Sequence, residues 1–493
     1  MIVLDSVARH VAEFPQRVAV ADDERLLTWR ELYAEVDALC GWLTVALNPS
    51  AENRVVAFSG NTSRLVVATA ACASLGIPWV GVDPARDRDT VREQVQAVQP
   101  TMVLVDMDLP NAVAVVEAAG ESGALVVNLS GDSFRNAVSY TGPTREWRKQ
   151  PFLALGFTSG STGTPKLFLR RTKSENQRLA YLRDHFGFGA GDVYLATSPM
   201  AHASGHVWVN AALTLGAKVV LGSFDPARMV ELVAEHRVGA AFFVPPVLDE
   251  FLAAAQARPD LDLSSLRAVL TGGRQTSARA IRTAKQRLGD VLHVYYATTE
   301  TGINTFACPA QLAASPRTTG LPMPGVRLLI VDPDTRDDRP ARQIGLIAIT
   351  SPLIMDNYAS GNADFVVRGT ERYVLTSDYG HLTPEGELII VGRSDSLPGD
   401  GTVDFVALES ELKDLPDVLD AAVVRKPAGD SAEVVAVVRL STGDTEAIEA
   451  RLAELLGTQR HSVLVVPRIP YNTAGKVDVR AMRSLLAETP AFA

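Results

Sequence analysis

The sequence predicts an α/β protein of at least two domains, the second of which is small and of the α+β type. Its 493 residues exceed the length that one hydrophobic core usually supports. Residues 54–84 read as strand, helix and strand, a βαβ pattern that requires parallel strands. Residues 409–456 have a separate pattern of helix, two strands and helix, which is typical of a small α+β unit.

Composition excludes several classes of protein. Hydrophobic residues make up 47% of the chain, as in soluble globular proteins, and no apolar run is long enough for a membrane-spanning helix. The net charge of −10 argues against nucleic acid or an anionic membrane surface as the main partner. Residues 1–5 lack the basic segment of a signal peptide. We therefore expect a cytoplasmic protein with no membrane span and no nucleic-acid partner.

The cysteines indicate the same kind of compartment. Cys40, Cys72 and Cys308 are scattered along the chain and have no spacing typical of a metal site. This pattern suggests a reducing compartment and buried thiols.

The first part of the chain alternates helices and strands. Thr28 is predicted to be the N-cap of a helix, and Glu31 three residues later completes a capping box. Helices are expected at residues 6–14 and 64–75, and strands at 17–21, 54–58, 76–84, 101–105 and 124–128.

Further strands are expected in the middle of the chain. Residues 240–246 read as a buried strand that ends in a turn, and residues 266–270 as a strand that runs into Thr271–Arg274. A glycine pair at the end of a strand, here Gly272 and Gly273, leaves space for a flat ligand ring against the backbone, although a plain turn is the default for such a pair. Residues 384–387 read as a turn.

Residues 158–166, TSGSTGTPK, follow the apolar run 152–157, which is predicted to be a buried strand. Glycines let backbone N–H groups approach an anion, hydroxyl groups donate hydrogen bonds and Lys166 supplies charge, so the loop suits a phosphate. The Walker A pattern fails, because Pro165 precedes the lysine and Leu167 follows it. The alternative is a flexible surface loop, but such linkers rarely end in Pro-Lys directly after a buried strand.

This loop resembles the phosphate-loop signature of the acyl-adenylate-forming (AMP-binding) superfamily, which comprises acyl-CoA synthetases, peptide-synthetase adenylation domains and luciferases. The resemblance implies ATP as cofactor and a catalytic contribution from Thr158. It also implies that the loop binds the nucleotide through Thr158, Ser159, Gly160, Ser161, Thr162, Gly163 and Lys166.

A second motif, YYATTE at residues 295–300, resembles the family's Y-G-x-T-E with Ala297 in place of glycine. Tyr296 offers a ring for stacking on adenine, and Thr299 can donate a hydrogen bond to a phosphate. Glu300 is a hard oxygen ligand, suited to the Mg²⁺ that accompanies ATP, and is also expected to be catalytic. The alternative is a strand end with a solvated glutamate.

Three other segments resemble nucleotide-binding segments of the family. Gly272, Gly273 and Arg274 match the segment that contacts adenine, although Arg274 stands where a small or acidic residue is frequent. Asp378 matches the aspartate that accepts hydrogen bonds from both ribose hydroxyls. Arg393 matches the arginine that contacts ribose and phosphate.

The stretch 199–206 resembles the family's P-x-x-H-x-x-G segment, which lines the carboxylate-substrate pocket. The resemblance places His202, Ala203 and Gly205 in that pocket together with Ala297, although a lone histidine is often structural. Amino-acid-activating relatives carry an aspartate here, and a buried ammonium group needs such a partner. This stretch has no carboxylate, so we expect a small carboxylic acid that is not an α-amino acid.

The resemblance also sets the expected domain organisation. It implies a large multi-sheet N-terminal adenylation domain at residues 1–394, the hinge at Asp395, and a small α+β C-terminal lid domain at residues 395–493. Lys476, in the Gly-Lys pair near the C-terminus, matches the family's catalytic lysine.

The reaction implied is attack of a carboxylate on the α-phosphate of ATP, which gives an acyl-adenylate and pyrophosphate, followed by transfer to a thiol of CoA or of the phosphopantetheine of an acyl carrier protein. Residues 395–402 depart from the family's D-D-x-I-K continuation, which leaves the acceptor open. The alternatives are transfer to an amine, as in an amide-forming ligase, and a nucleotide-binding homologue without catalytic activity.

Overall fold

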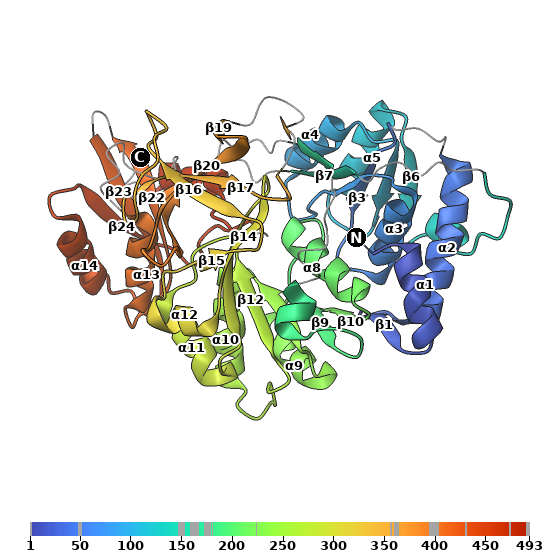
Figure 1. The fold of residues 1–493 in the computed structure, drawn as a ribbon, viewed down its shortest axis with the longest axis horizontal. Coiled ribbons are helices and arrows are strands. Elements are labelled where there is room, and N and C mark those ends of the chain that lie inside the picture. Colours follow the sequence, from blue (N-terminus) through green and yellow to red (C-terminus); the bar gives the residue numbers. More distant parts are fainter. Residues whose placement is uncertain are drawn as a thin grey trace.

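The computed structural model describes residues 2–47, 52–145, 153–157, 167–171, 179, 181–222, 224–354, 357–358, 364–393, 404–428, 431–472 and 475–489. Figure 1 shows a multi-sheet N-terminal part and, at the left of the view, a smaller C-terminal domain beside it. The fold is therefore the predicted mixed α/β class with a large multi-sheet domain and a small C-terminal domain. The predicted hinge, Asp395, lies outside the described residues.

The N-terminal elements follow the predicted βαβ pattern. The capping box is confirmed: Thr28 accepts a hydrogen bond from the backbone N–H of Glu31, and the Glu31 carboxylate accepts one from the backbone N–H of Thr28. Strands β4, β3, β5 and β6 form a parallel sheet in that order. The elements are α1 (Leu4–Glu13), α2 (Trp29–Ala46), β3 (Val55–Phe58), α3 (Ser63–Leu75), β4 (Trp79–Gly81), α4 (Arg88–Val98), β5 (Met102–Val105), α5 (Ala112–Glu121), β6 (Leu125–Asn128) and α6 (Asp132–Ala137).

The largest sheet in the described part of the chain has the order β15-β14-β13-β12-β11-β9-β10-β1-β2. Its strands are β1 (Val18–Ala21), β2 (Leu26–Thr28), β9 (Val193–Ala196), β10 (Lys218–Leu221), β11 (Ala240–Phe243), β12 (Ala268–Gly272), β13 (Leu292–Thr298), β14 (Gly302–Ala307) and β15 (Leu321–Pro322). The strands from β1 to β13 in this order run parallel, and β14, β15 and β2 are antiparallel to their neighbours.

Both faces of this sheet are buried, which explains its continuous apolar strands. In β11, Ala241 and Phe243 face helices α9 (Pro226–His236), α10 (Pro245–Ala257) and α11 (Ala278–Leu288), and Phe242 faces the side that carries α8 (Ala203–Thr214). The predicted turn after β11 is wrong. Pro245 begins α10 instead, because a proline is well accommodated in the first turn of a helix.

Two smaller sheets complete the large domain. Strands β7 (Leu153–Phe157) and β8 (Leu167–Arg171) are antiparallel, and β8 also pairs with β18 (Asn357–Tyr358). The predicted strand before the phosphate loop is therefore confirmed as β7. The other sheet contains β16 (Arg327–Val331), β17 (Gly345–Thr350), β19 (Phe365–Arg368), β20 (Glu371–Leu382) and β21 (Leu388–Arg393). Two short helices also belong to this domain: η1 (Tyr181–His185) and α12 (Pro309–Ala314).

The C-terminal domain is a three-stranded sheet with helices on both faces. It comprises α13 (Phe405–Asp414), β22 (Val418–Ala428), β23 (Ser431–Leu440), α14 (Glu446–Leu456), β24 (His461–Val465) and α15 (Val479–Glu488). One face packs against α13 and α14 through residues such as Leu412 and Leu452, and the other against α15 through Met482. This layering gives the domain its own hydrophobic core.

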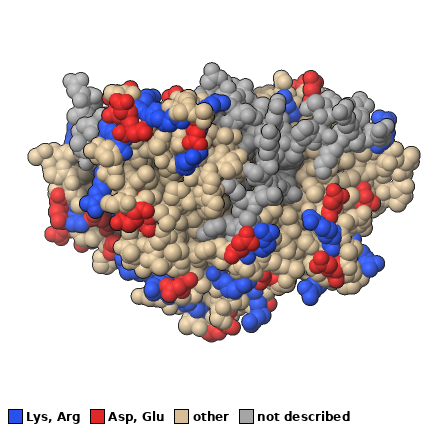
Figure 2. Space-filling model, viewed as in Figure 1, with Lys and Arg blue, Asp and Glu red and all other residues tan. Residues whose placement is uncertain are grey.

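The distribution of surface charge and the state of the cysteines can be compared with the expectations from composition. On the face shown in Figure 2, basic and acidic side chains are interspersed rather than gathered by sign. Cys40 and Cys72 are buried as predicted, whereas Cys308 is only half-buried, and none of the three forms a disulfide. None of the helices in the described ranges is both long and apolar enough to cross a bilayer.

A histidine lies in an aromatic cluster beside the large sheet. His293 on β13 is 5% exposed and contacts the rings of Phe186 and Phe306 at 4.8 and 5.6 Å between centroids. Burial lowers the pKa of His293 to about 4, although a hydrogen bond with the Val291 carbonyl oxygen opposes the shift. The folded state therefore favours neutral His293.

This burial makes stability depend on pH. In the unfolded chain His293 takes up a proton below about pH 6.5, whereas in the folded chain it does so only below about pH 4. The free energy of unfolding therefore falls as the pH falls from about 6.5 to about 4. We expect His293→Phe to remove about 3 kcal/mol of the loss in unfolding free energy between pH 7 and pH 4, as measured by urea denaturation. The matched control is His461→Gln on β24. If wild type and His293→Phe lose stability equally over this range, this account of His293 is wrong.

Candidate active site

Several sequence-predicted residues of the large domain come together from the strands β13, β20 and β21. Tyr296 lies on β13, and Thr299 and Glu300 lie in the turn that follows it. Asp378 on β20 and Arg393 on β21 are direct partners across the antiparallel pair. Antiparallel pairing brings together two residues fifteen positions apart in the sequence, with their side chains on the same face of the sheet.

Asp378 connects these residues. Its Oδ2 accepts a hydrogen bond of 2.6 Å from the Tyr296 hydroxyl, and its Oδ1 lies 3.7 Å from Nε of Arg393. Burial, and then the nearby Asp378 carboxylate, raise the pKa of Tyr296 well above its usual value of about 10. The phenol therefore remains protonated and holds the aspartate in one orientation.

Lys476 of the C-terminal domain reaches the same place. The residue is half-buried, and its ammonium group is within electrostatic range of Arg393, Asp378 and Glu300. Burial lowers the pKa of Lys476, Arg393 lowers it further, and the two carboxylates oppose the shift. Residues from both domains thus form one charged site.

The turn that carries Lys476 has a defined shape. Asn472 and Lys476 exchange hydrogen bonds of 2.8 and 3.1 Å, and Tyr471 pairs with Val477 across the turn. Gly475 has a φ of +73°, and a Cβ placed on it would lie 2.5 Å from the side chain of Val244 in the large domain. Glycine is required because the backbone is left-handed and a neighbouring domain touches it.

We expect Gly475→Ala to lower the rate of the reaction at this site by about 10- to 100-fold, because displacing Lys476 by about 1 Å is enough for such a loss. Gly457→Ala is the matched control: Gly457 also has a positive φ, of +56°, but a Cβ placed on it would have no atom within 4 Å. Both variants carry the left-handed strain, so similar losses of activity would contradict the steric explanation. Adding Val244→Ala should partly restore the reaction rate of the Gly475→Ala variant, because it removes the side chain that the new Cβ would meet.

The predicted glycine pair closes β12 beside β13. A Cβ on Gly272 would lie 2.6 Å from the Tyr295 carbonyl oxygen, and Gly273 has a φ of +91°. The next residue, Arg274, does not direct its guanidinium to this loop. It donates hydrogen bonds to Tyr471 Oη and Glu409 Oε2 of the C-terminal domain at 2.5 and 2.6 Å.

The predicted acid-pocket histidine is paired. His202 is the N-cap residue of α8, and its Nε2 lies 3.1 Å from Oδ2 of buried Asp83, whose carboxylate is also 3.9 Å from Nε of Arg86. Gly205 is close-packed, since a Cβ there would meet the Pro199 carbonyl oxygen at 2.2 Å. Ala203, in contrast, is exposed, and Ala297 is half-buried on β13, next to the bulge of β14.

The phosphate loop lies outside the described residues, so Thr158, Ser159, Gly160, Ser161, Thr162, Gly163 and Lys166 keep their sequence-based assignments. The flanking pair Phe157 and Leu167 is described, as the first rung of the β7–β8 ladder.

Sequence reasoning missed two residues near the site. Asp83 lies near the end of the predicted strand 76–84, for which the sequence predicts no functional role, yet it is the partner of His202. Asn304 is the extra residue of a bulge on β14, facing the step between Tyr296 and Ala297, and is fully buried, with both side-chain amide atoms unpartnered among the described residues. A buried amide is an unusual residue in an apolar strand, and this is the signal that could have revealed it.

Residues 7–359 match the family model described as AMP-binding enzyme. The chain belongs to the AMP-binding enzyme family. An uncharacterized acyl-CoA ligase of Bacillus subtilis is 24% identical over 487 residues, with 96% of each chain covered. An indoleacetate–CoA ligase of Aromatoleum aromaticum is 26% identical over 507 residues, which is 98% of this chain and 97% of the relative.

Two solved structures of other proteins have the same fold. An amide bond synthetase of Marinactinospora thermotolerans is 25% identical, with a TM-score of 0.85 and coverage of 98% of this chain and 100% of the other. ATP-bound MatB of Rhodopseudomonas palustris has a TM-score of 0.84 over 99% of each chain, at 22% identity. The second likeness supports the fold alone.

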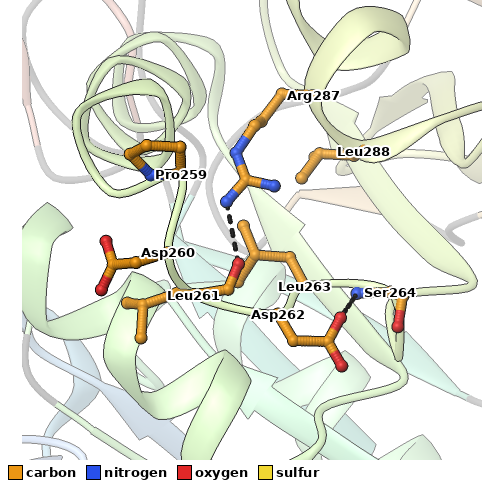
Figure 3. Close-up of a pocket in the computed structure, with 8 residues that line it drawn as sticks. All are labelled: Pro259, Asp260, Leu261, Asp262, Leu263, Ser264, Arg287 and Leu288. Atoms are coloured by element: carbon orange, nitrogen blue, oxygen red, sulfur yellow. Dashed lines mark hydrogen bonds between the residues drawn. The ribbon is translucent and has the colours of Figure 1, made fainter.

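A surface pocket elsewhere does not belong to this site. It lies between the end of α10 and the end of α11, and Figure 3 shows Arg287 pointing across it to the Leu261 carbonyl oxygen. Arg287 also donates to the carbonyl oxygens of Ala255 and Arg258, so its guanidinium is occupied in holding the loop that follows α10. The lining residues are Pro259, Asp260, Leu261, Asp262, Leu263, Ser264, Arg287 and Leu288.

Proposed function

We propose that this protein uses ATP to activate a carboxylic acid as an acyl-adenylate and then transfers the acyl group to a thiol, either CoA or a carrier-protein phosphopantetheine. The observation that carries the proposal is the approach of Lys476 to Glu300, Asp378 and Arg393 across the two domains. A cation placed against nucleotide-binding carboxylates is the arrangement that adenylation needs. The domain boundary at Asp395 and the catalytic role of Lys476 are parts of this proposal.

The nucleotide fits the residues present. Asp378 keeps acceptor capacity for the two ribose hydroxyls while Tyr296 and Arg393 hold its carboxylate in place. The ring of Tyr296 provides a stacking surface for adenine beside Gly272 and Gly273. Thr299 and the loop Thr158–Lys166 would hold the phosphates.

Glu300 is the proposed ligand for Mg²⁺. Within the described residues, no group of three or more His, Cys, Asp or Glu side chains is arranged to hold a metal ion by itself. A single glutamate suits Mg²⁺ that arrives with ATP, since phosphate oxygens and water complete the octahedron. When bound, the ion would withdraw negative charge from the leaving pyrophosphate.

In the first step, a carboxylate oxygen of the acid attacks the α-phosphorus, and the bond to the bridging oxygen breaks to release pyrophosphate. Lys476 orients the carboxylate and neutralises charge on the α-phosphate. In the second step, the sulfur of a thiol attacks the acyl carbon, AMP leaves with the bonding electrons, and the thiol proton passes to solvent. Closure of the C-terminal domain excludes water from the adenylate between the two steps.

The acid is proposed not to be an α-amino acid. Although Asp83 places a carboxylate beside His202, that carboxylate is already paired with His202 and Arg86 and is buried. A substrate ammonium group would have to compete with both partners. The buried amide of Asn304 is a candidate contact for a polar group of the acid.

Transfer to an amine is the second candidate. The observations that favour it are the likeness to an amide bond synthetase and the altered sequence at residues 395–402. Incubating the enzyme with its acid, ATP and either CoA, a phosphopantetheine thiol or a set of amines separates the two, because the products are thioesters or amides.

The test of the first step is hydroxylamine trapping with aryl, fatty and small carboxylic acids. We expect one class of acid to give a hydroxamate that depends on ATP and on Mg²⁺. If every acid fails although the protein binds ATP, and α-amino acids succeed, the proposed substrate class is wrong. If no acid of any class is activated, the proposed activity is wrong.

A further inference from the structure

Several hydrogen bonds and ion pairs cross the contact between the two domains. In five cases an arginine of the large domain contacts a carboxylate or a main-chain carbonyl group of the C-terminal domain. Helix α11 lies beside α13 at this contact (Figure 1). The pairs are Arg274 with Glu409, Arg279 with the carbonyl oxygens of Val418 and Leu419, Arg282 with Asp414, Arg317 with Asp404, and Arg86 with Asp478.

Arg274 is less exposed than the arginines of the other ion pairs. Its side chain is 12% exposed and that of Glu409 is 16% exposed, whereas the Arg282 and Asp414 side chains are 58% and 35% exposed. Arg274 also donates to the Ala421 carbonyl oxygen at 3.2 Å, and its guanidinium lies 5.0 Å from the centroid of the Tyr471 ring. These bonds offset the desolvation of the buried charge pair, and loss of either partner leaves an uncompensated charge.

Glu409 is held as firmly as Arg274. Its Oε1 accepts a hydrogen bond of 2.9 Å from the backbone N–H of Val423, while Oε2 accepts from Arg274. The carboxylate therefore links α13 and β22 of the C-terminal domain to one side chain of the large domain.

Arg274 and its partner Tyr471 are each close in sequence or structure to residues of the proposed active site. Arg274 directly follows Gly272 and Gly273, the proposed wall for adenine. Tyr471, which accepts from Arg274, pairs with Val477, the residue after Lys476. One guanidinium thus joins the nucleotide side of the large domain to the base of the lysine turn.

We propose that Arg274 is a positioning residue for adenylation: through Glu409 and Tyr471 it holds the C-terminal domain in the orientation in which Lys476 reaches the α-phosphate. The inference rests on the proposed function and assigns to Arg274 a role in one half-reaction only. Transfer from a preformed adenylate does not need Lys476 at the phosphate, so it does not need this contact.

The test compares the two half-reactions in Arg274→Gln, Glu409→Gln and the double variant. We expect Arg274→Gln to lower kcat of acid-dependent ATP–pyrophosphate exchange by about 100-fold, with KM for ATP changed by less than about 3-fold. Transfer from synthetic acyl-AMP to the thiol acceptor should stay within about 3-fold of wild type. The double variant should be no slower than Arg274→Gln, since both substitutions remove one contact.

Arg274→Lys and Arg282→Gln are the matched controls. Lysine restores the charge pair but not the hydrogen bonds to Tyr471 and Ala421, so Arg274→Lys should recover part of the exchange rate. Arg282→Gln removes an exposed pair from the same contact and should change exchange by less than about 3-fold. If Arg282→Gln and Arg274→Gln have equal effects, or if Arg274→Gln slows both half-reactions equally, Arg274 is not a positioning residue.

A readout that needs neither a carboxylic acid nor catalysis separates this inference from the proposed function. Hydrogen–deuterium exchange of the ATP-bound protein should show faster exchange in α13 and at the start of β22 in Arg274→Gln than in wild type. Unchanged exchange in these segments would overturn the inference, whatever reaction the protein catalyses. Failure of wild-type protein to exchange pyrophosphate with any acid would instead overturn the proposed function.

Discussion

Replacing Lys476 by Ala is expected to lower the rate of acyl-adenylate formation by about 100- to 1,000-fold, the loss usual for a group that stabilises charge in the transition state. The Lys476 ammonium group is the cation that the C-terminal domain brings to Glu300 and Asp378. The measurement is the initial rate of acid-dependent hydroxamate formation at saturating ATP. The melting temperature should hardly change, because the side chain lies on a turn rather than in a core.

The control for Lys476→Ala is Lys285→Ala, which removes a surface lysine, 60% exposed and paired with Asp290. It should leave the rate within about 2-fold of wild type, because exposed ion pairs contribute little. An equal rate in wild type and Lys476→Ala would remove Lys476 from its proposed role. Lys476→Arg separates charge from geometry and should recover only part of the rate.

Replacing Asp378 by Asn should raise KM for ATP by about 100-fold. The carboxylate accepts from Tyr296 Oη and lies against Arg393, and its remaining acceptor sites are proposed to hold the ribose hydroxyls. A hydrogen bond to a charged group contributes about 1.5–3 kcal/mol, so weakening two of them accounts for this factor. Equilibrium binding of ATP to both proteins checks the prediction directly.

Two further variants sharpen the Asp378 prediction. Tyr296→Phe removes only the hydroxyl that orients the carboxylate and should raise KM for ATP by less than about 10-fold. Asp338→Asn, at an exposed pair with Arg368, should have no measurable effect on ATP binding. Normal ATP affinity in Asp378→Asn would show that the ribose is bound elsewhere.

Much of the fold could be predicted from local patterns. The Thr28 capping box and the parallel pair of β3 and β4 follow from short-range rules and were confirmed. The prediction of a turn after β11 was wrong. Proline is common both in loops and at the start of a helix, so the local sequence around Pro245 does not distinguish the two. The order of strands in the large sheet depends on contacts between distant segments, and no local pattern carries that information.

The candidate site was also only partly predictable, because local motifs indicate residues but not the contacts between distant segments. Motif order indicated Tyr296, Glu300, Asp378, Arg393 and Lys476, and the structure brings these residues together. The guanidinium of Arg274 instead contacts the C-terminal domain, whose Glu409 is more than one hundred residues away in the sequence. Asp83 and His202 are likewise far apart in the chain, so their pairing could not be read from either segment.

The central claim is that residues of both domains form one site for acyl-adenylate synthesis. Acid-dependent exchange of labelled pyrophosphate into ATP, measured without any acceptor, tests it most directly. For the acid selected by trapping, we predict rapid exchange in wild type, a loss of about 100-fold or more in Lys476→Ala, and acyl-AMP detectable by mass spectrometry. Exchange that does not depend on a carboxylic acid, or that is unaffected by Lys476→Ala, would contradict the claim.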